Sequence, residues 1–156
     1  MRTTKQKVIS YIIIILSVLL VAGLGTLFVN LGNQWYSTLQ RPSQFVPDFI
    51  IPVVWTIIYS IFIVVLCLWT SKQAINTKTI VLLIINAVLN VLWCLVFFTL
   101  NQTFLGLVCI IALLIASYFL IFEIKKHSDL YFYLTLIYPV WASIATALNL
   151  SLWILN

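Results

Sequence analysis

The sequence predicts an all-α integral membrane protein, in which a single domain of 156 residues forms a bundle of five transmembrane helices. Two properties of the composition support this fold class: 64% of the residues are apolar and only 7% are charged, against about 25% charged residues in an ordinary soluble domain. The third observation is that the apolar residues fall in five long runs, each close to the roughly 20 residues that a helix needs to cross a bilayer. Together these observations exclude a soluble globular domain, a disordered chain and a coiled coil.

The five predicted spans follow one another along the chain with mostly short connections. The first span follows Arg2, Lys5 and Lys7, as a secretory signal would, but its apolar run is too long for a signal sequence and no cleavage motif follows it. Pro139 lies in the last span and should kink it, because proline removes a backbone hydrogen bond from a helix. The spans are expected at about residues 8–29, 49–70, 79–100, 104–124 and 130–155.

One connection, residues 30–48, is much longer than the others. It is polar and rich in turn-forming residues, and it also holds Trp35, Tyr36 and Phe45. Loops of this length in compact domains are often lids or binding loops. We therefore expect residues 30–48 to form a lid over one end of the bundle.

The charged residues are distributed very unevenly between the two ends of the predicted bundle. Arg41 is the only lysine or arginine on one side, and seven lie on the other: Arg2, Lys5, Lys7, Lys72, Lys78, Lys125 and Lys126. The positive-inside rule then predicts a bacterial cell membrane protein with a cytoplasmic N-terminus and a C-terminus outside. A nucleic-acid partner is not expected, because these cations form no continuous basic face.

The chemistry-bearing residues inside the spans are amides rather than charged groups. No ionisable residue is placed at mid-membrane, which disfavours a proton-coupled carrier. Cys67, Cys94 and Cys109 show no metal-ligand spacing, so we predict neither a metal site nor a cofactor. The amides of Asn86, Asn90 and Asn149 have two interpretations, as hydrogen bonds between helices or as polar groups lining a ligand cavity.

Aromatic residues form a second pattern within the spans. Trp55 and Tyr59 are separated by four residues, as are Trp93 and Phe97, so each pair shares one helix face. Residues 141, 145 and 149 (Trp, Ala and Asn) likewise lie on one face of the last span. Such stripes are either ordinary packing or the walls of a flat aromatic pocket between helices.

At these residues the sequence resembles a known family, the translocator proteins or tryptophan-rich sensory proteins (TspO/MBR, the peripheral-type benzodiazepine receptor family). The resemblance extends over all five spans in order. It is carried by WYSTLQRPS (35–43), VVWTIIY (53–59), NAVLNVLWCLVFF (86–98) and YPVWASIATALN (138–149).

The resemblance implies a five-helix bundle, commonly a homodimer, with a pocket capped by the first loop. It also implies binding of protoporphyrin IX, haem and synthetic benzodiazepine- or isoquinoline-type ligands. Trp55 and Trp141 match pocket walls of the family, and Trp35, Arg41 and Pro42 match its loop motif. The candidate ligand-binding residues are Trp35, Arg41, Pro42, Trp55, Tyr59, Asn86, Asn90, Trp93, Phe97, Trp141, Ala145 and Asn149.

Two departures from the family pattern affect these expectations. Gln44 and Val46 stand where the family commonly has a loop tryptophan and a loop proline, which predicts a looser lid. After Asn149 the chain has no tyrosine followed by a cation, so no sterol recognition is expected through a C-terminal motif.

The functional hypothesis is therefore a membrane protein that binds tetrapyrroles within the bundle and acts in porphyrin sensing, transport or stress response. The alternative is an enzyme that degrades protoporphyrin IX with light and oxygen. Only in that case would Trp55 and Trp141 be catalytic, and the porphyrin would be a substrate rather than a cofactor.

Overall fold

The computed structural model describes residues 3–42 and 46–156, so Arg2 and Gln44 lie outside the described residues. The described chain is helical, and five of its segments are long and apolar enough to cross a membrane, which confirms the predicted fold class. The third span is α3 followed by η1, and the fifth is α5 followed by α6. The elements are α1 (Thr4–Thr38), α2 (Ile50–Lys72), α3 (Thr77–Cys94), η1 (Leu95–Thr99), α4 (Thr103–Lys125), α5 (Asp129–Thr135) and α6 (Ile137–Leu155).

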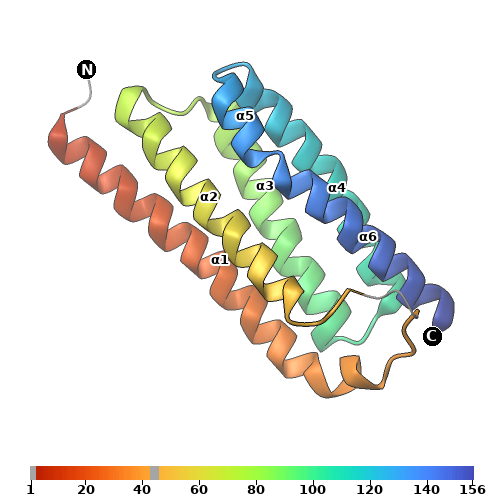
Figure 1. Cartoon of the computed structure of the whole chain (residues 1–156). Helices are drawn as coiled ribbons and strands as arrows, with labels where there is room; N and C mark the ends of the chain where they lie inside the picture. Colours follow the sequence, from red (N-terminus) through yellow and green to blue (C-terminus); the bar gives the residue numbers. More distant parts are fainter. Residues whose placement is uncertain (1–2, 43–45) are drawn as a thin grey trace.

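The connections alternate between the two ends of the bundle. The N-terminus, the α2–α3 loop and the α4–α5 loop lie at one end, which we call the N-terminal end (Figure 1). The α1–α2 loop, the turn after η1 and the C-terminus lie at the other, the C-terminal end. All lysines therefore belong to the N-terminal end, and Arg41 belongs to the C-terminal end, as the alternation of spans predicts. Which end faces the cytoplasm stays a prediction.

The first helix is longer than expected, and the loop prediction of residues 30–48 is wrong for its first half. Helix α1 begins with a capping box between Thr3 and Gln6 and continues to Thr38. Trp35 is thus a helical residue. Gly32 alone does not stop a helix, since glycine inside a helix costs only about 1 kcal/mol, and the chain leaves the helix shortly before Pro42.

The third span ends in a π-helical turn that the sequence pattern does not reveal. In η1 the Leu100 amide donates to the Leu95 carbonyl, five residues back, at 2.9 Å. Asn101 then reverses the chain with a φ of 56°, a left-handed conformation that asparagine tolerates. The wider turn allows two consecutive residues, Phe97 and Phe98, both to be buried.

The last span is broken close to the predicted kink. Helix α5 ends at Thr135 and α6 begins at Ile137, two residues before Pro139. Proline has no N–H to donate to the carbonyl of Thr135, four residues earlier. The break orients the beginning of α6, including Tyr138, toward α3 and α2, where its hydroxyl and ring make contacts.

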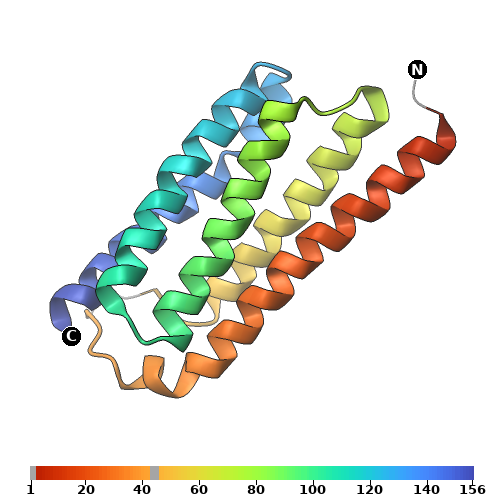
Figure 2. The same ribbon diagram turned by 180° about the vertical axis from the view of Figure 1, so that it is seen from behind.

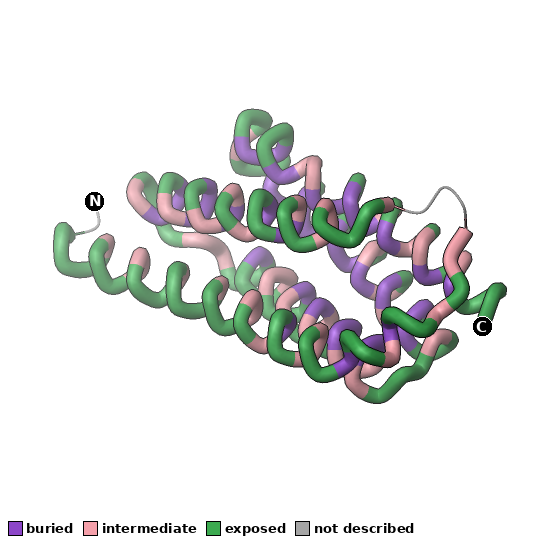
Figure 3. The backbone as a smooth tube through the Cα atoms, turned by 60° about the horizontal axis from the view of Figure 1, so that its bottom comes forward, coloured by how far each residue is buried: buried purple, intermediate pink, exposed green. Residues whose placement is uncertain are grey.

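Helix α1 packs less closely than the other spans. Its buried residues are Gly25, Gly32 and Tyr36, all in its second half. Figure 3 shows its first half exposed along almost its whole length. The aliphatic side chains on that half include Ile12, Leu16 and others exposed by more than half, as expected of side chains that meet lipid tails rather than protein.

Candidate functional site

Six aromatic residues meet at the C-terminal end of the bundle, and we call them the aromatic cluster: Tyr36, Trp55, Trp93, Phe97, Phe98 and Trp141. They come from α1, α2, α3, η1 and α6, and each is at most 9% exposed. The ring centroids of Trp55 and Trp93 lie 6.0 Å apart, and those of Tyr36 and Phe98 lie 5.2 Å apart. The aromatic stripes of separate spans therefore converge on one place.

The cluster surrounds a cavity of only about 30 Å³, the small cavity, which Ala145 and Asn149 also line. This volume is close to that of one water molecule in the liquid, so the site is closed to a flat ligand in this conformation. Trp141 is 6% exposed, and its indole Nε1 has no hydrogen-bond partner among the described residues. A buried donor of this kind calls for an acceptor, which a water or a bound ligand would supply.

The three intramembrane amides join helices to one another. The Trp93 indole N–H donates to Asn149 Oδ1 at 3.2 Å, linking α3 to α6. Asn86 Nδ2 donates to the Ala116 carbonyl of α4 at 3.1 Å, and the Tyr138 hydroxyl donates to Asn86 Oδ1 at 3.1 Å. All three amides also line a cavity. Hydrogen bonding between helices is therefore confirmed, whereas a role of the amides in binding a ligand stays a prediction.

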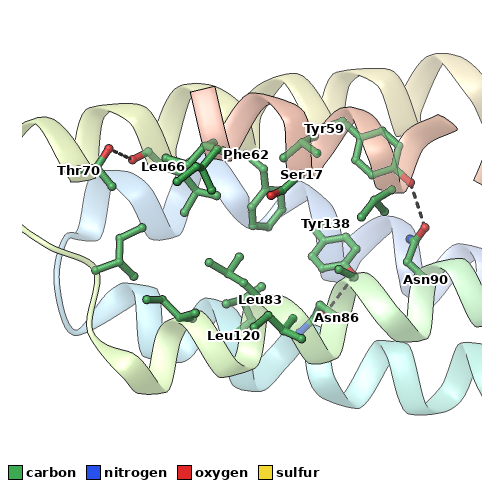
Figure 4. Close-up of a pocket in the computed structure, with 18 of the residues that line it drawn as sticks. Ser17, Tyr59, Phe62, Leu66, Thr70, Leu83, Asn86, Asn90, Leu120 and Tyr138 are labelled. Atoms are coloured by element: carbon green, nitrogen blue, oxygen red, sulfur yellow. Dashed lines mark hydrogen bonds between the residues drawn. The ribbon is translucent and has the colours of Figure 1, made fainter. Parts of the chain in front are cut away.

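A second and much larger cavity, of about 650 Å³, lies in the N-terminal half of the bundle between α1, α2 and α3, and we call it the large cavity. Figure 4 shows Tyr59 and Asn90 at one of its ends and Thr70 at the other. The Tyr59 hydroxyl donates to Asn90 Oδ1 at 2.9 Å. The Trp55 ring stacks on the Tyr59 ring at 5.8 Å, so these two residues form part of the wall between the two cavities.

The predicted site residues are thus divided between two places. Trp55, Trp93, Phe97, Trp141, Ala145 and Asn149 line the small cavity, whereas Tyr59, Asn86 and Asn90 line the large one. Trp35 touches the cluster from outside, with its ring 5.5 Å from that of Phe97.

The loop residues Arg41 and Pro42 line neither cavity. Arg41 Nη1 binds both carboxylate oxygens of Asp48 at 2.8 Å, and Nη2 donates to the Tyr36 carbonyl at 3.1 Å. Its guanidinium also lies 4.4 Å from the centre of the Tyr36 ring. Arg41 therefore fastens the α1–α2 loop to the end of α1 in this conformation.

Besides Phe62, sequence reasoning missed three aromatic residues of the two sites. Tyr36 and Phe98 belong to the aromatic cluster, and Tyr138 lies at the large cavity with its ring 5.4 Å from that of Phe62. All three stand inside the strings that carry the family resemblance, next to residues that were selected. Tyr36 was assigned to a loop, and the burial of Phe98 depends on the π-turn.

Charged groups gather at the N-terminal end, away from the aromatic cluster. Glu123 Oε2 lies 3.0 Å from Lys78 Nζ and 2.9 Å from Lys126 Nζ. His127 Nε2 lies 2.6 Å from Asn76 Nδ2, and its ring lies 4.5 Å from that of Trp69. In the described ranges no three histidine, cysteine or acidic residues come close enough to bind a metal ion.

Comparison with known proteins extends the similarity over the whole bundle. A model of the TspO/MBR family matches residues 13–154, a range that includes every residue of both cavity linings except Ser10. The tryptophan-rich protein TspO of Archaeoglobus fulgidus is 31% identical over 153 residues, covering 97% of this chain and 99% of that protein. Protein CrtK of Rhodobacter capsulatus is 30% identical over 131 residues, covering 80% and 79%. The tryptophan-rich protein TspO of Chlorobaculum tepidum is 31% identical over 137 residues, covering 85% and 86%.

Proposed function

Because the chain belongs to the TspO/MBR family, we propose that this integral membrane protein is a receptor for flat tetrapyrroles such as protoporphyrin IX or haem. The proposed site is the aromatic cluster, with Trp55 and Trp141 as its walls. The observation that carries the proposal is the convergence of six aromatic rings from five elements on one cavity. Biologically, such binding serves porphyrin sensing, transport or a stress response.

The chemistry of the cluster suits a flat aromatic ligand. Offset stacking of aromatic rings contributes about 0.5–1.5 kcal/mol per pair beyond the burial of apolar area. The unpartnered Nε1 of Trp141 supplies a hydrogen-bond donor for a ring substituent or a carboxylate. Synthetic benzodiazepine- or isoquinoline-type ligands share this flat aromatic character and should compete for the same site.

Binding requires the small cavity to open, and the ion pair of Arg41 with Asp48 adds little to the cost of that opening. The Arg41–Asp48 pair is partly exposed, with side-chain exposures of 24% and 58%, and such pairs contribute only about 0–1 kcal/mol. Lifting the loop would free Arg41 at the C-terminal end of the bundle. The guanidinium can then exchange Asp48 for a carboxylate of the ligand.

The test is a titration of the purified protein with protoporphyrin IX in the dark, followed by the absorbance and fluorescence of the porphyrin itself. Trp55→Ala combined with Trp141→Ala should weaken binding about 5- to 150-fold, since two stacking contacts of about 1–3 kcal/mol in total are lost. Trp153→Ala is the matched control, because Trp153 is 41% exposed and packs on Phe104 at the periphery. Equal affinity of the double variant and the wild type would refute this site.

A second variant distinguishes the aromatic cluster from the large cavity as the binding place. Ala87 lines the large cavity and is absent from the small one. Ala87→Trp should therefore leave the porphyrin affinity within about twofold of the wild type. A large loss in Ala87→Trp, with no loss in the double tryptophan variant, would place the tetrapyrrole in the large cavity instead.

The enzymatic alternative is favoured by one observation, that Trp55 and Trp141 line the same cavity and would flank a bound pigment together. It predicts that illumination in air bleaches the porphyrin faster with the wild type than with the double variant. Bleaching at the same rate with both proteins would leave binding without catalysis.

The homodimer implied by the family stays a prediction, which sizing in detergent would test.

A further inference from the structure

We propose that the large cavity holds one acyl chain of an anionic phospholipid from the surrounding bilayer, with the lipid phosphate among lysines at the N-terminal end of the bundle. This site is separate from the aromatic cluster, and the proposal does not depend on tetrapyrrole binding. The argument uses the position of the cavity mouth, the chemistry of the wall and the charges beside it.

The mouth of the cavity lies between α1 and α3. Ile13 of α1 and Ile80 and Ile84 of α3 line the cavity and are also 59%, 44% and 57% exposed. The lining residues of α2, such as Phe62 and Leu66, are buried instead. Figure 2 shows the first half of α1 leaning away from α3, with α2 behind the gap. The cavity therefore opens sideways, at a level where exposed aliphatic side chains face lipid.

The wall of the cavity suits a hydrocarbon chain. The volume of the large cavity, about 650 Å³, falls within the range of roughly 300–1,000 Å³ typical of small-molecule sites. The larger polar side chains on the wall are paired within the protein: Tyr59 with Asn90, and Tyr138 with Asn86. The Thr70 hydroxyl donates to the Leu66 carbonyl at 2.9 Å. The remaining lining residues are mostly isoleucine, leucine, valine and phenylalanine.

Positive charge lies beside the N-terminal end of the cavity. Ser10 of α1 and Thr70 of α2 line that end. Lys7 lies three residues before Ser10, and Lys72 lies two residues after Thr70. Lys78 is paired with Glu123, whereas Lys7 and Lys72 form no ion pair with the described residues. Lysines near a membrane surface attract anionic lipids by about 1 kcal/mol each. A lipid whose chain enters between α1 and α3 would have its phosphate at this level.

The decisive experiment uses the wild-type chain in vesicles of phosphatidylcholine and phosphatidylglycerol, with a trace of phosphatidylglycerol that carries a photoreactive diazirine in one acyl chain. After illumination, mass spectrometry of peptides locates the adducts. We expect adducts on Phe62, Leu66 or Tyr138, which line the cavity and are only 8%, 5% and 5% exposed. Adducts confined to outward-facing residues such as Ile85, which is 41% exposed and absent from the lining, would overturn the proposal.

A pair of neighbouring variants tests the same site by a second measurement. Ala87→Trp fills the cavity, whereas Val88→Trp places the same ring on the lipid-facing side, since Val88 is 58% exposed and not part of the lining. Native mass spectrometry should show at least a tenfold loss of retained phosphatidylglycerol in Ala87→Trp and no loss in Val88→Trp. Equal retention in the two variants would contradict an acyl chain in the cavity. A dimer in which a second copy of the chain covers the mouth and excludes the lipid would contradict it as well.

The lysines are tested by the preference between lipids. Lys7→Gln combined with Lys72→Gln should reduce the preference for the diazirine phosphatidylglycerol over the matching phosphatidylcholine by about 30-fold, since two contacts of about 1 kcal/mol each are lost. The buried residues should still be labelled by the phosphatidylcholine probe. An unchanged preference would refute the anionic headgroup. Tetrapyrrole affinity is measured on the same preparations. That measurement tests the proposed function separately, because its result does not depend on the lipid results.

Discussion

Gly32 of α1 lies directly against the backbone of the third span. A Cβ atom built there would overlap the carbonyl group of Phe98 in η1. Gly32→Ala should therefore lower the stability of the detergent-solubilised protein by roughly 1–3 kcal/mol, the usual range for overpacking. Gly23→Ala is the matched control in the same helix, because nothing lies within 4 Å of the added atom. Thermal unfolding followed by circular dichroism should separate the two variants, and equal melting temperatures would contradict the close approach.

The bond between Trp93 and Asn149 is one of two polar links between α3 and α6, and the other joins Asn86 to Tyr138. Polar contacts between helices in a membrane contribute about 0.6–1.7 kcal/mol. A double-mutant cycle with Trp93→Phe and Asn149→Ala should return a coupling energy in that range from unfolding in mixed micelles. A parallel cycle that combines Trp93→Phe with Asn86→Ala should return a value close to zero, since Asn86 bonds to Ala116 and Tyr138 instead. Similar coupling in both cycles would refute a specific bond.

At the residue scale the sequence identified the three asparagines and five of the aromatic residues that line the cavities, but not how they are grouped. Spacing places Asn86 and Asn90 on one face of a helix, and both do line the large cavity. Spacing does not say which neighbouring helix that face meets. For this reason Trp55 and Tyr59, four residues apart and stacked on each other, were assigned to one site although they line different cavities.

At the scale of elements, the α1–α2 loop is fastened to the last residue of the chain as well as to α1. The Gln40 amide donates to Asn156 Oδ1 at 2.9 Å, and Asn156 Nδ2 donates to the Gln40 carbonyl at 3.1 Å. Asn156→Ala should therefore accelerate hydrogen–deuterium exchange of peptides that contain Gln40. Ser151→Ala, which removes only a bond within α6, is the control. Unchanged exchange in Asn156→Ala would show that the side chain does not hold the loop.

The elements themselves were predictable to different degrees. Five spans follow from five apolar runs, because a helix is the structure that satisfies its backbone hydrogen bonds within one apolar segment. The break in the fifth span follows from Pro139. The extension of α1 through Trp35 and the π-turn at residues 95–99 were not apparent from the composition of those segments, and the two bring Tyr36 of α1 against Phe97 and Phe98 of η1.

At the scale of the whole molecule, the two cavities follow from the uneven packing of α1. Near the C-terminal end α1 lies against η1, with Gly32 allowing the close approach and the Thr99 hydroxyl donating to the Phe28 carbonyl at 3.0 Å. Near the N-terminal end α1 is exposed and leaves space beside α2 and α3 (Figure 3). The small cavity is therefore closed and the large cavity is open in the same bundle.

The same separation of ends predicts the orientation of the protein in its membrane. Six described lysines lie at the N-terminal end, Lys5, Lys7, Lys72, Lys78, Lys125 and Lys126, against Arg41 at the other. Lysines and arginines in short loops next to the spans are retained in the cytoplasm. Gln102, in the turn after η1, should therefore face outward, and Gln73, in the α2–α3 loop, should face inward. In a variant whose three native cysteines are replaced, Gln102→Cys should react with a membrane-impermeant maleimide in intact cells. Gln73→Cys should react only after the cells are permeabilised. The opposite labelling pattern would show that the bundle has the reverse orientation. The anionic lipid would then lie in the outer leaflet and the aromatic site in the cytoplasmic half.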